Sequence, residues 1–428
     1  MNVEIVFLYG LEDHVAEDFT IFGGSASWLN LAKLGRMYEL ARKERVPFIM
    51  LQDGAGARAQ EGDGEGIPTF KWFSEFRTLS GLVPVVSAVL GPCAGHSALM
   101  ASGADMVVMT RGTSMLAAAG PRIVSQATGK KITKEELGGA SVHCDISGTA
   151  DIGAANDAEA IAAVRRYLSY LPQNAYAYPP IVSEFARPKR QVNDVYEIVP
   201  ADSGAPYNMH DLMDTIIDGG SFFELKQAYS PMLLTGFATI EGQSIGIVAS
   251  QPAVGAGALV ADSLVKFRKF VDICDNFHVP LLFLVDVPGA VPAREEEERG
   301  VLRQSMAAAH LMAQVTTQMI SVVVRKAYGV AGSVMCGGSS GQTVGLCWAT
   351  ADMSSLPPMS RTMVASHLAA NLDEYRASTD PLRSTNSLSF DDVIEPAETR
   401  QRILAALKLG ANRRTEAPVR KTRHGIMP

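Results

Sequence analysis

Two stretches of the chain repeat the same order of glycine turns, amphipathic segments and short apolar runs. The matching positions lie 233 residues apart: Gly24, Leu31, Lys33, Val46, Pro47, Asp53, Gly56 and Ala57 recur as Gly257, Leu264, Lys266, Val279, Pro280, Asp286, Gly289 and Ala290. Each copy runs from a glycine turn through an amphipathic stretch and a proline to an apolar run, at 48–53 or 281–286, and then to a second glycine-rich loop. This order is typical of a βαβ unit. We therefore expect a duplicated α/β fold with two half-sites.

The amphipathic stretches predict helices over 25–44 and 258–277, the second opened by Gly255 and Gly257. Their apolar residues recur at helical spacing, so the interspersed cations are expected on solvated faces. These cations are Lys33, Arg36, Lys266 and Lys269. Strands are predicted over 84–91 and 319–326, and each should lead through a glycine turn into another helix.

Prolines indicate where the first module ends. Pro172, Pro179 and Pro180 interrupt regular structure, which predicts a linker over about 172–206 and domains at 1–185 and 200–428. The C-terminal segment is predicted to be helical from 396 to about 410. After it come Arg413, Arg414, Arg420, Lys421 and Arg423, which we interpret as a frayed, solvated end, with a phosphate or partner contact as the alternative.

Composition narrows the class of protein. With 428 residues, 47% of them hydrophobic, each half can bury a core. The net charge of −7 argues against nucleic acid or anionic lipid as a partner. The five cysteines have neither disulfide-framework nor metal-site spacing, which favours a reducing cytoplasm and no bound metal. No apolar run reaches the roughly 18 residues that a membrane span needs.

Candidate chemistry lies in backbone turns, because no Ser/His/Asp triad, metal motif or phosphate loop is recognisable. Glycine turns occur at 53–62, 91–96, 286–293 and 326–332. A glycine turn that opens a helix points unpaired amides at a developing oxyanion, which suits an enolate formed from a thioester. The alternative is that these glycines only permit close packing of strand and helix. Four turns at matching places in two repeats favour the oxyanion interpretation.

The residues also resemble a known family over most of the chain. EDFTIFGGS resembles QDFTVFGGS, DGAGARAQEG resembles SGGARIQEG, and GPCAGH, ATGKKIT, LSYLPQN, FVDICDNFHVPLLFLVDVPG and RKAYGVAGSVM follow in family order. The chain is similar to the carboxyltransferase (beta) subunit of biotin-dependent acyl-CoA carboxylases, of the propionyl-CoA carboxylase beta type, in the crotonase superfamily. The resemblance implies an α/β fold of two tandem crotonase-like (ββα superhelix) domains.

The resemblance also implies roles for residues. Acyl-CoA would be held by the first domain of one subunit and carboxybiotin by the second domain of its neighbour, in a homo-oligomer that the family suggests is a hexamer. The amides of Gly95 and His96 would polarise the acyl thioester, and those of Val330 and Ala331, after Gly329, would stabilise the ureido oxygen of biotin. Further substrate-binding candidates are Gly54, Ala55, Gly56, Ala57, Arg58 and Ser333. For Arg58 a phosphate contact competes with a structural ion pair.

Biotin itself must come from another protein, because the chain has no Met-Lys pair to carry it. The partners implied are therefore a biotin carboxyl carrier or biotin carboxylase subunit and a coenzyme A ester as substrate. Carboxybiotin would supply carbon dioxide and the base for the α proton, so no acid or base from the protein is needed.

Several positions depart from the family pattern. His96 and Val330 stand where glycine is usual, and Ser333 stands where propionyl-type enzymes have aspartate. The segment 354–364 lacks the usual glycine-rich sequence. His96 could narrow the acyl pocket or act as an acid. The acyl group therefore stays open, and two alternatives remain: a decarboxylase of malonyl-, methylmalonyl- or glutaconyl-type CoA esters, or a non-catalytic scaffold subunit.

Overall fold

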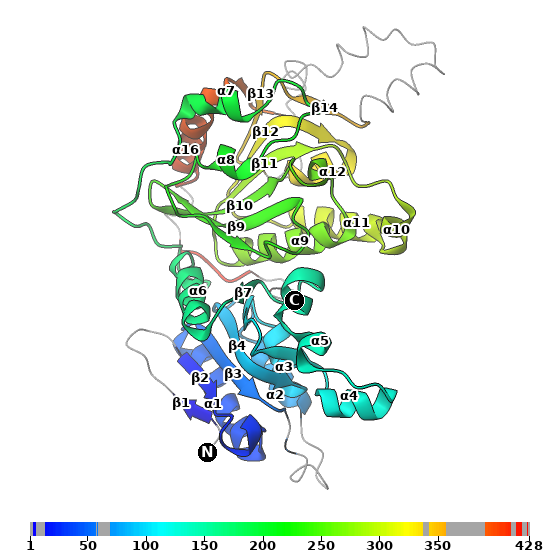
Figure 1. Ribbon diagram of the computed structural model, residues 1–428. Helices are drawn as coiled ribbons and strands as arrows, with labels where there is room; N and C mark the ends of the chain where they lie inside the picture. Colours follow the sequence, from blue (N-terminus) through cyan, green and yellow to red (C-terminus); the bar gives the residue numbers. More distant parts are fainter. Residues whose placement is uncertain are drawn as a thin grey trace. The chain divides into compact units, whose positions relative to one another are not determined.

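The computed structural model describes residues 3–5, 13–56, 58, 69–336, 342–356, 390–411, 417–421 and 426. The chain divides into two compact units, each built on its own sheet (Figure 1). Unit 1 consists of residues 1–178, 225–229 and 418–428, and unit 2 of residues 179–224 and 230–417. No helix in the described part of the chain has the length and apolar character needed to cross a membrane.

Unit 1 is built on a sheet with the strand order β1-β2-β3-β4-β5-β7, and β6 pairs with β4. The strands are β1 Val3–Ile5, β2 Asp13–Glu17, β3 Phe48–Gly54, β4 Val85–Ala94, β5 Met106–Thr110, β6 Met115–Ala117 and β7 Ile152–Ala154. The helices are α1 Trp28–Glu44, α2 Thr69–Arg77, α3 His96–Ser102, α4 Pro121–Thr128, α5 Lys134–Gly138 and α6 Asp157–Ser169, with a π-helical segment at Ser141–Ile146. Only β1 and β2 pair antiparallel. The carboxyl ends of β3 and β4 therefore lie at the same edge of the sheet.

Unit 2 repeats this plan with the strand order β15-β13-β12-β11-β10-β9-β8, and β14 pairs with β12. Its strands are β8 Phe223–Leu225, β9 Leu233–Ile240, β10 Gln243–Ser250, β11 Leu281–Val287, β12 Met319–Tyr328, β13 Val344–Trp348, β14 Asp352–Ser354 and β15 Asp392–Ile394. Its helices are α7 Val195–Ile198, α8 Met209–Met213, α9 Ala261–Asn276, α10 Arg294–Glu298, α11 Val301–Met312, α12 Gly329–Met335 and α16 Thr399–Gly410. The mixed α/β class expected from the sequence is confirmed.

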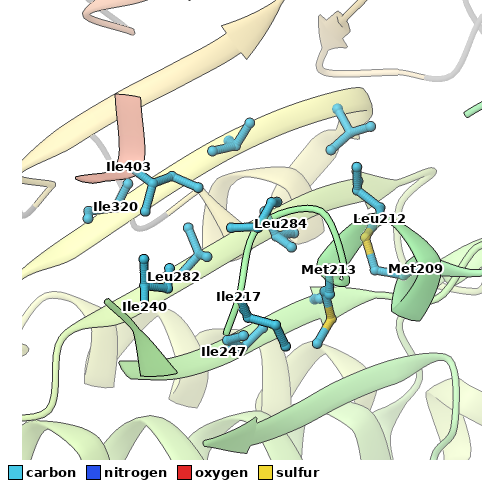
Figure 2. Close-up of a cluster of buried hydrophobic side chains, with 14 of the residues drawn as sticks. Met209, Leu212, Met213, Ile217, Ile240, Ile247, Leu282, Leu284, Ile320 and Ile403 are labelled. Carbon is cyan, nitrogen blue, oxygen red and sulfur yellow. The ribbon is translucent and has the colours of Figure 1, made fainter. Parts of the chain in front are cut away.

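Both faces of the unit 2 sheet are covered, because successive side chains of a strand point to opposite faces. Leu282 and Leu284 of β11 belong to one cluster with residues of α8 and α16 (Figure 2). Phe283, between them, points the other way and lies 6.2 Å from Phe267 of α9 between ring centroids. Central strands buried on both faces explain the continuous apolar run in the sequence.

The duplication extends to individual backbone hydrogen bonds. In unit 1 the Ala26 amide donates to Gly56 O at 2.7 Å, and in unit 2 the Leu259 amide donates to Gly289 O at 3.0 Å. Arg45, directly after α1, and His278, two residues after the end of α9, both have a positive φ, 56° and 57°. The offset of 233 becomes 234 at β4 and β12, so unit 2 has one extra residue before β12.

The two predicted amphipathic helices are confirmed as α1 and α9, but the expected exposure of the α9 lysines is wrong. Residues 255–257 form a short 3-10 turn, and α9 starts after it at Ala261. Lys266 and Lys269 are only 1% and 7% exposed. Lys266 Nζ lies 3.4 Å from Ser230 O, which partly satisfies its charge. The error arises because α9 is covered on more than one side, so helical spacing alone did not identify its exposed face.

The expectation of a solvated C-terminal end is wrong for Arg420 and Ile426, although Val419 is exposed. Arg420 Nη2 donates to Ser80 O at 2.8 Å. Ile426 is 2% exposed, and its carbonyl accepts from Arg77 Nη2 at 2.6 Å. The segment thus packs on unit 1. The predicted helix over 396–410 is confirmed by α16, while Arg413, Arg414 and Arg423 lie outside the described residues.

Candidate functional site

The first predicted turn links β4 to α3 and depends on Gly95. This residue has φ 63° and ψ −123°, a conformation that favours glycine. Its amide donates to Ala117 O of β6 at 3.0 Å, so the Gly95 N–H is already used. The amide of His96, the first residue of α3, has no hydrogen-bond partner within the described residues. Of the two amides proposed for the thioester, the geometry thus favours the His96 amide.

A second turn, after β3, lies directly against the first. A Cβ atom on Gly56, which has φ 87°, would lie 2.6 Å from Ala94 O and 3.9 Å from Gly95 Cα. The Gly56 carbonyl accepts from Ala26, whereas the Gly56 amide has no partner within the part of the chain that the structure describes. Two backbone amides without partners among the described residues, those of Gly56 and His96, therefore belong to neighbouring turns, and backbone amides are the usual donors of oxyanion sites.

The other candidates on the β3 turn have packing roles. A Cβ on Gly54 would lie 2.7 Å from Gly24 O, and the Ala55 amide donates to Gly23 O at 2.9 Å. Arg58 Nη2 donates to Ser25 O at 3.0 Å. The same guanidinium lies 4.7 Å from the centroid of the Phe22 ring. These contacts, with a carbonyl and an aromatic ring, favour a structural role for Arg58. Ala57 lies outside the described residues.

The corresponding turn of unit 2 connects β12 to α12. Gly329 has φ 59° and corresponds to Gly95, because the two units are 234 residues apart from β4 and β12 onward. The amides of Val330 and Ala331 have no partner within the described ranges, and the Val330 side chain is 62% exposed. Ser333 is exposed on the same helix, and its Oγ donates to Gly329 O at 3.3 Å. Residues 357–364 of the divergent segment are not among those described.

A buried ionic cluster behind the unit 2 turn was missed by the sequence analysis. Asp286 Oδ2 lies 2.7 Å from Arg325 Nε, and Asp286 Oδ1 lies 3.3 Å from Lys326 Nζ. Arg325 Nη1 also donates to Asp202 O at 2.8 Å, and Lys326 Nζ to Ser203 O at 2.6 Å. The sequence signal was present: an aspartate and an Arg-Lys pair end two apolar runs, which the fold places on adjacent parallel strands.

The His96 side chain turns into unit 1. Both ring nitrogens are buried, and the ring centroid lies 5.0 Å from that of Phe73. Burial lowers the pKa of His96, which favours the neutral imidazole at pH 7.

Ser97, the residue after His96, donates from Oγ to Glu17 Oε1 at 2.8 Å. Burial is also the main reason why the pKa of Glu17 rises to about 7, and the hydrogen bond from Ser97 partly offsets this effect. Among the described residues, no three His, Cys, Asp or Glu side chains form a group that could hold a metal ion.

Comparison with known proteins identifies relatives over almost the whole chain. Residues 10–425 match the family model described as "Carboxyl transferase domain". The carboxyltransferase subunit of propionyl-CoA carboxylase from Haloferax mediterranei is 35% identical, over 96% of this chain and 82% of the relative. The methylmalonyl-CoA decarboxylase subunit alpha of Veillonella parvula is 32% identical, over 96% and 82%.

Solved structures agree with this comparison. The crystal structure of transcarboxylase 12S, a hexamer with hydrolysed methylmalonyl-coenzyme A bound, matches with a TM-score of 0.86 and 32% identity. The match covers 97% of this chain and 82% of the transcarboxylase chain. The fold is therefore shared with a multienzyme core whose crystal structure holds hydrolysed methylmalonyl-coenzyme A.

Proposed function

This chain belongs to the carboxyl transferase family, and on that premise we propose that it moves a carboxyl group from carboxybiotin on a separate protein to the α carbon of an acyl-CoA. Family membership makes it an acyl-CoA carboxyltransferase with the crotonase-like α/β fold of transcarboxylase 12S. Beyond family membership, we propose the direction of carboxyl transfer, a separate protein that carries biotin, and the residues that take part.

One observation carries the assignment of residues. Both units present backbone amides without partners at the start of matching helices, at His96 in unit 1 and at Val330 and Ala331 in unit 2. Gly95 and Gly329, with φ 63° and 59°, make the same turn before them. Every helix start leaves amides without intrahelical partners, so the assignment rests on their position directly after the same positive-φ glycine turn in both units. Amide donors of this kind stabilise negative charge that develops on oxygen.

The chemistry follows from these donors. The amides of His96 and Gly56 would hold the thioester oxygen of the acyl-CoA and stabilise the enolate that forms when the α proton leaves. Carboxybiotin, when bound, would supply carbon dioxide and the base that takes this proton. The amides of Val330 and Ala331 suit an oxygen such as that of the biotin ureido group, because they are adjacent donors at the start of a helix, where N–H groups lack intrahelical partners.

The proposed assembly follows the relatives. We place acyl-CoA on unit 1 of one subunit and carboxybiotin on unit 2 of its neighbour, in a homo-oligomer of the hexameric type known for transcarboxylase 12S. Biotin would be brought by a carrier or biotin carboxylase subunit.

The five cysteines are buried and form no disulfide, which is consistent with a reducing cytoplasm.

A decarboxylase is the second candidate, because two relatives are named methylmalonyl-CoA decarboxylase subunit alpha, at 32% and 33% identity. The same enolate site would run in reverse. A purely structural scaffold is less favoured, because both units keep the positive-φ glycine, Gly95 or Gly329, directly before the helix that carries the candidate amides.

The deciding experiment incubates the purified chain with malonyl-CoA and with methylmalonyl-CoA, with and without free biotin, and follows loss of the carboxyl group by mass spectrometry. Biotin-dependent loss supports the carboxyltransferase site. Loss that is equally fast without biotin would transfer the assignment to the decarboxylase. Loss in neither condition, with a correctly folded oligomer, would contradict both for these two acyl groups.

A further inference from the structure

A small, partly open cavity in unit 1 lies directly behind the first turn of α3. It offers about 20 Å³ to a water-sized molecule. Its polar lining comes from four elements: Glu17 of β2, Tyr38 of α1, Gln52 of β3, and His96 and Ser97 of α3. Apolar side chains, among them Leu34 and Met100, close the rest of the wall. A volume of roughly 10–15 Å³ is enough for one water molecule when polar groups surround it.

Several polar atoms around this cavity are buried without a hydrogen-bond partner among the described residues. They are Oε2 of Glu17, the hydroxyl of Tyr38 and both ring nitrogens of His96. The Tyr38 residue is only 2% exposed. The other two polar residues are already paired, Ser97 with Glu17 and Gln52 with Cys93, whose Sγ lies 3.0 Å from Gln52 Oε1. Buried polar atoms of folded proteins are nearly always satisfied by protein or by ordered water.

The fold does not require these polar groups. In unit 2 the positions that correspond to Glu17, Tyr38 and His96 are Ser250, Val271 and Val330. Ser250 Oγ accepts from the Asp286 amide at 3.1 Å, and Val271 is fully buried. The same backbone plan thus exists with two of the three polar side chains replaced by valine. The polar lining is a property of unit 1 alone.

We propose that the cavity binds one water molecule, held by Glu17, Tyr38 and His96, and that Glu17 positions the start of α3 through this water and through Ser97. His96 and Ser97 are the first two residues of α3. The Ser97 hydroxyl is bonded directly to Glu17, and the water would bond the His96 ring to the same carboxyl. Hydrogen bonds would then join both His96 and Ser97 to Glu17 of β2. These bonds would orient the His96 amide. This catalytic consequence rests on the proposed function, whereas the water site does not.

The charge of Glu17 matters for this arrangement. The groups around it are Tyr38 of α1, Asp53 of β3, Cys93 of β4 and His96 of α3, with Glu75 of α2 acting on Tyr38. None of them is a permanent cation, which agrees with the raised pKa of Glu17, about 7. A protonated Glu17 can donate from Oε2 to the water, while the carboxylate can only accept. The hydrogen-bond pattern at the start of α3 therefore changes as the pH passes 7.

The water is tested without any substrate, by a crystal structure of the intact protein at a resolution that shows ordered solvent. One water within hydrogen-bond distance of Glu17, Tyr38 and His96 is expected. An empty cavity overturns the proposal. Because this readout needs no activity, it stands even if the protein transfers no carboxyl group.

The role of Glu17 is tested with Glu17→Gln, which keeps the shape and an acceptor for Ser97 but cannot ionise. Glu39→Gln, on the outer face of α1, is the matched control. A carboxyl whose folded pKa is raised loses stability as the pH rises through that value. The Tm of the wild type should therefore fall relative to Glu17→Gln between pH 6 and pH 8, and Glu39→Gln should follow the wild type. Parallel Tm curves for Glu17→Gln and the wild type overturn the proposal.

Activity adds a readout that a merely structural Glu17 would not change. If malonyl-CoA loses its carboxyl group with free biotin, kcat of the wild type should show an ionisation near pH 7 that Glu17→Gln lacks, with KM for malonyl-CoA nearly the same. An unchanged pH profile of kcat in Glu17→Gln would overturn the positioning role. Complete inactivity of the wild type on malonyl-CoA would contradict the proposed function for this acyl group but not the water site.

Discussion

Arg325 Nε lies 2.7 Å from Asp286 Oδ2, and these side chains, 3% and 0% exposed, connect the carboxyl ends of β12 and β11. Lys326 adds a second cation to the same carboxylate, at 3.3 Å. The turn with Gly329 follows three residues after Lys326, so this ionic cluster supports the amides proposed to face biotin. In unit 1 the corresponding aspartate, Asp53, has one carboxyl oxygen that is buried and without a partner among the described residues.

Asp286→Asn should strongly destabilise unit 2. The substitution leaves two buried cations without their counter-charge, and breaking a buried pair in this way costs about 3–5 kcal/mol. Urea unfolding of the variant and the wild type measures the difference. Glu298→Gln is the control, because its pair with Arg294 is exposed, and it should cost less than about 1 kcal/mol. Equal losses in the two variants would contradict the assignment.

Gly95→Ala should lower carboxyl transfer more than stability. A side chain at φ 63° and ψ −123° is strained, so the turn shifts and with it the His96 amide. Loss of one oxyanion donor lowers kcat by about 10²–10³. Gly112→Ala serves as control, since Gly112 also has a positive φ, 78°, with open space around its Cβ position. Matching kcat values for the two variants would remove this turn from the site.

Arg58→Ala should affect folding rather than affinity for CoA esters. The guanidinium donates a hydrogen bond to Ser25 O and stacks on the Phe22 ring. Its removal therefore leaves the turn over residues 22–25 without these two contacts. Charge-assisted hydrogen bonds contribute about 1.5–3 kcal/mol each, which thermal unfolding should detect as a lower Tm. KM for the acyl-CoA should stay nearly constant. An increase in KM of about tenfold, roughly 1.4 kcal/mol, would restore the phosphate contact considered from the sequence.

Ile426→Ala should destabilise unit 1 although it lies three residues from the C-terminus. Ile426 is 2% exposed, and truncation of such a side chain to alanine costs about 2–5 kcal/mol. Val419→Ala in the same segment, where the side chain is 67% exposed, should change stability by less than about 0.5 kcal/mol. Chemical denaturation compares them. If the two values agree, the segment does not pack as described.

The pair of His210 and Glu224 should make stability depend on pH. Nε2 of His210 lies 2.8 Å from Glu224 Oε2, and this hydrogen bond is the main reason why the pKa of His210 is raised. A raised histidine pKa contributes stability that is complete below the unfolded value, about 6.5, and is lost as the pH rises through the folded value. The Tm difference between the wild type and Glu224→Gln should therefore be larger at pH 6 than at pH 8. A difference that does not shrink would count against the pair.

The sequence by itself determined the duplication, the central strands β3, β4, β11 and β12, the helices α1, α3, α9, α12 and α16, and the four glycine turns. These features depend on local chemistry: apolar runs form buried strands, and glycine reaches the positive φ that Gly95 and Gly329 adopt. The family resemblance, carried by long ordered motifs, also sufficed for the class of enzyme. The candidate site residues of both units could be located in this way, because the amides belong to the turns themselves.

Only the tertiary structure decided which of these amides are free, which cations are buried and where polar groups gather. The Gly95 amide is used by Ala117, Lys266 is covered by neighbouring elements, and Arg420 bonds to Ser80. Glu17 and Ser97 meet across 80 residues of chain. Such contacts are made between segments distant in sequence, and no local pattern records them. Their energies depend on the position of both partners, which only the folded chain defines.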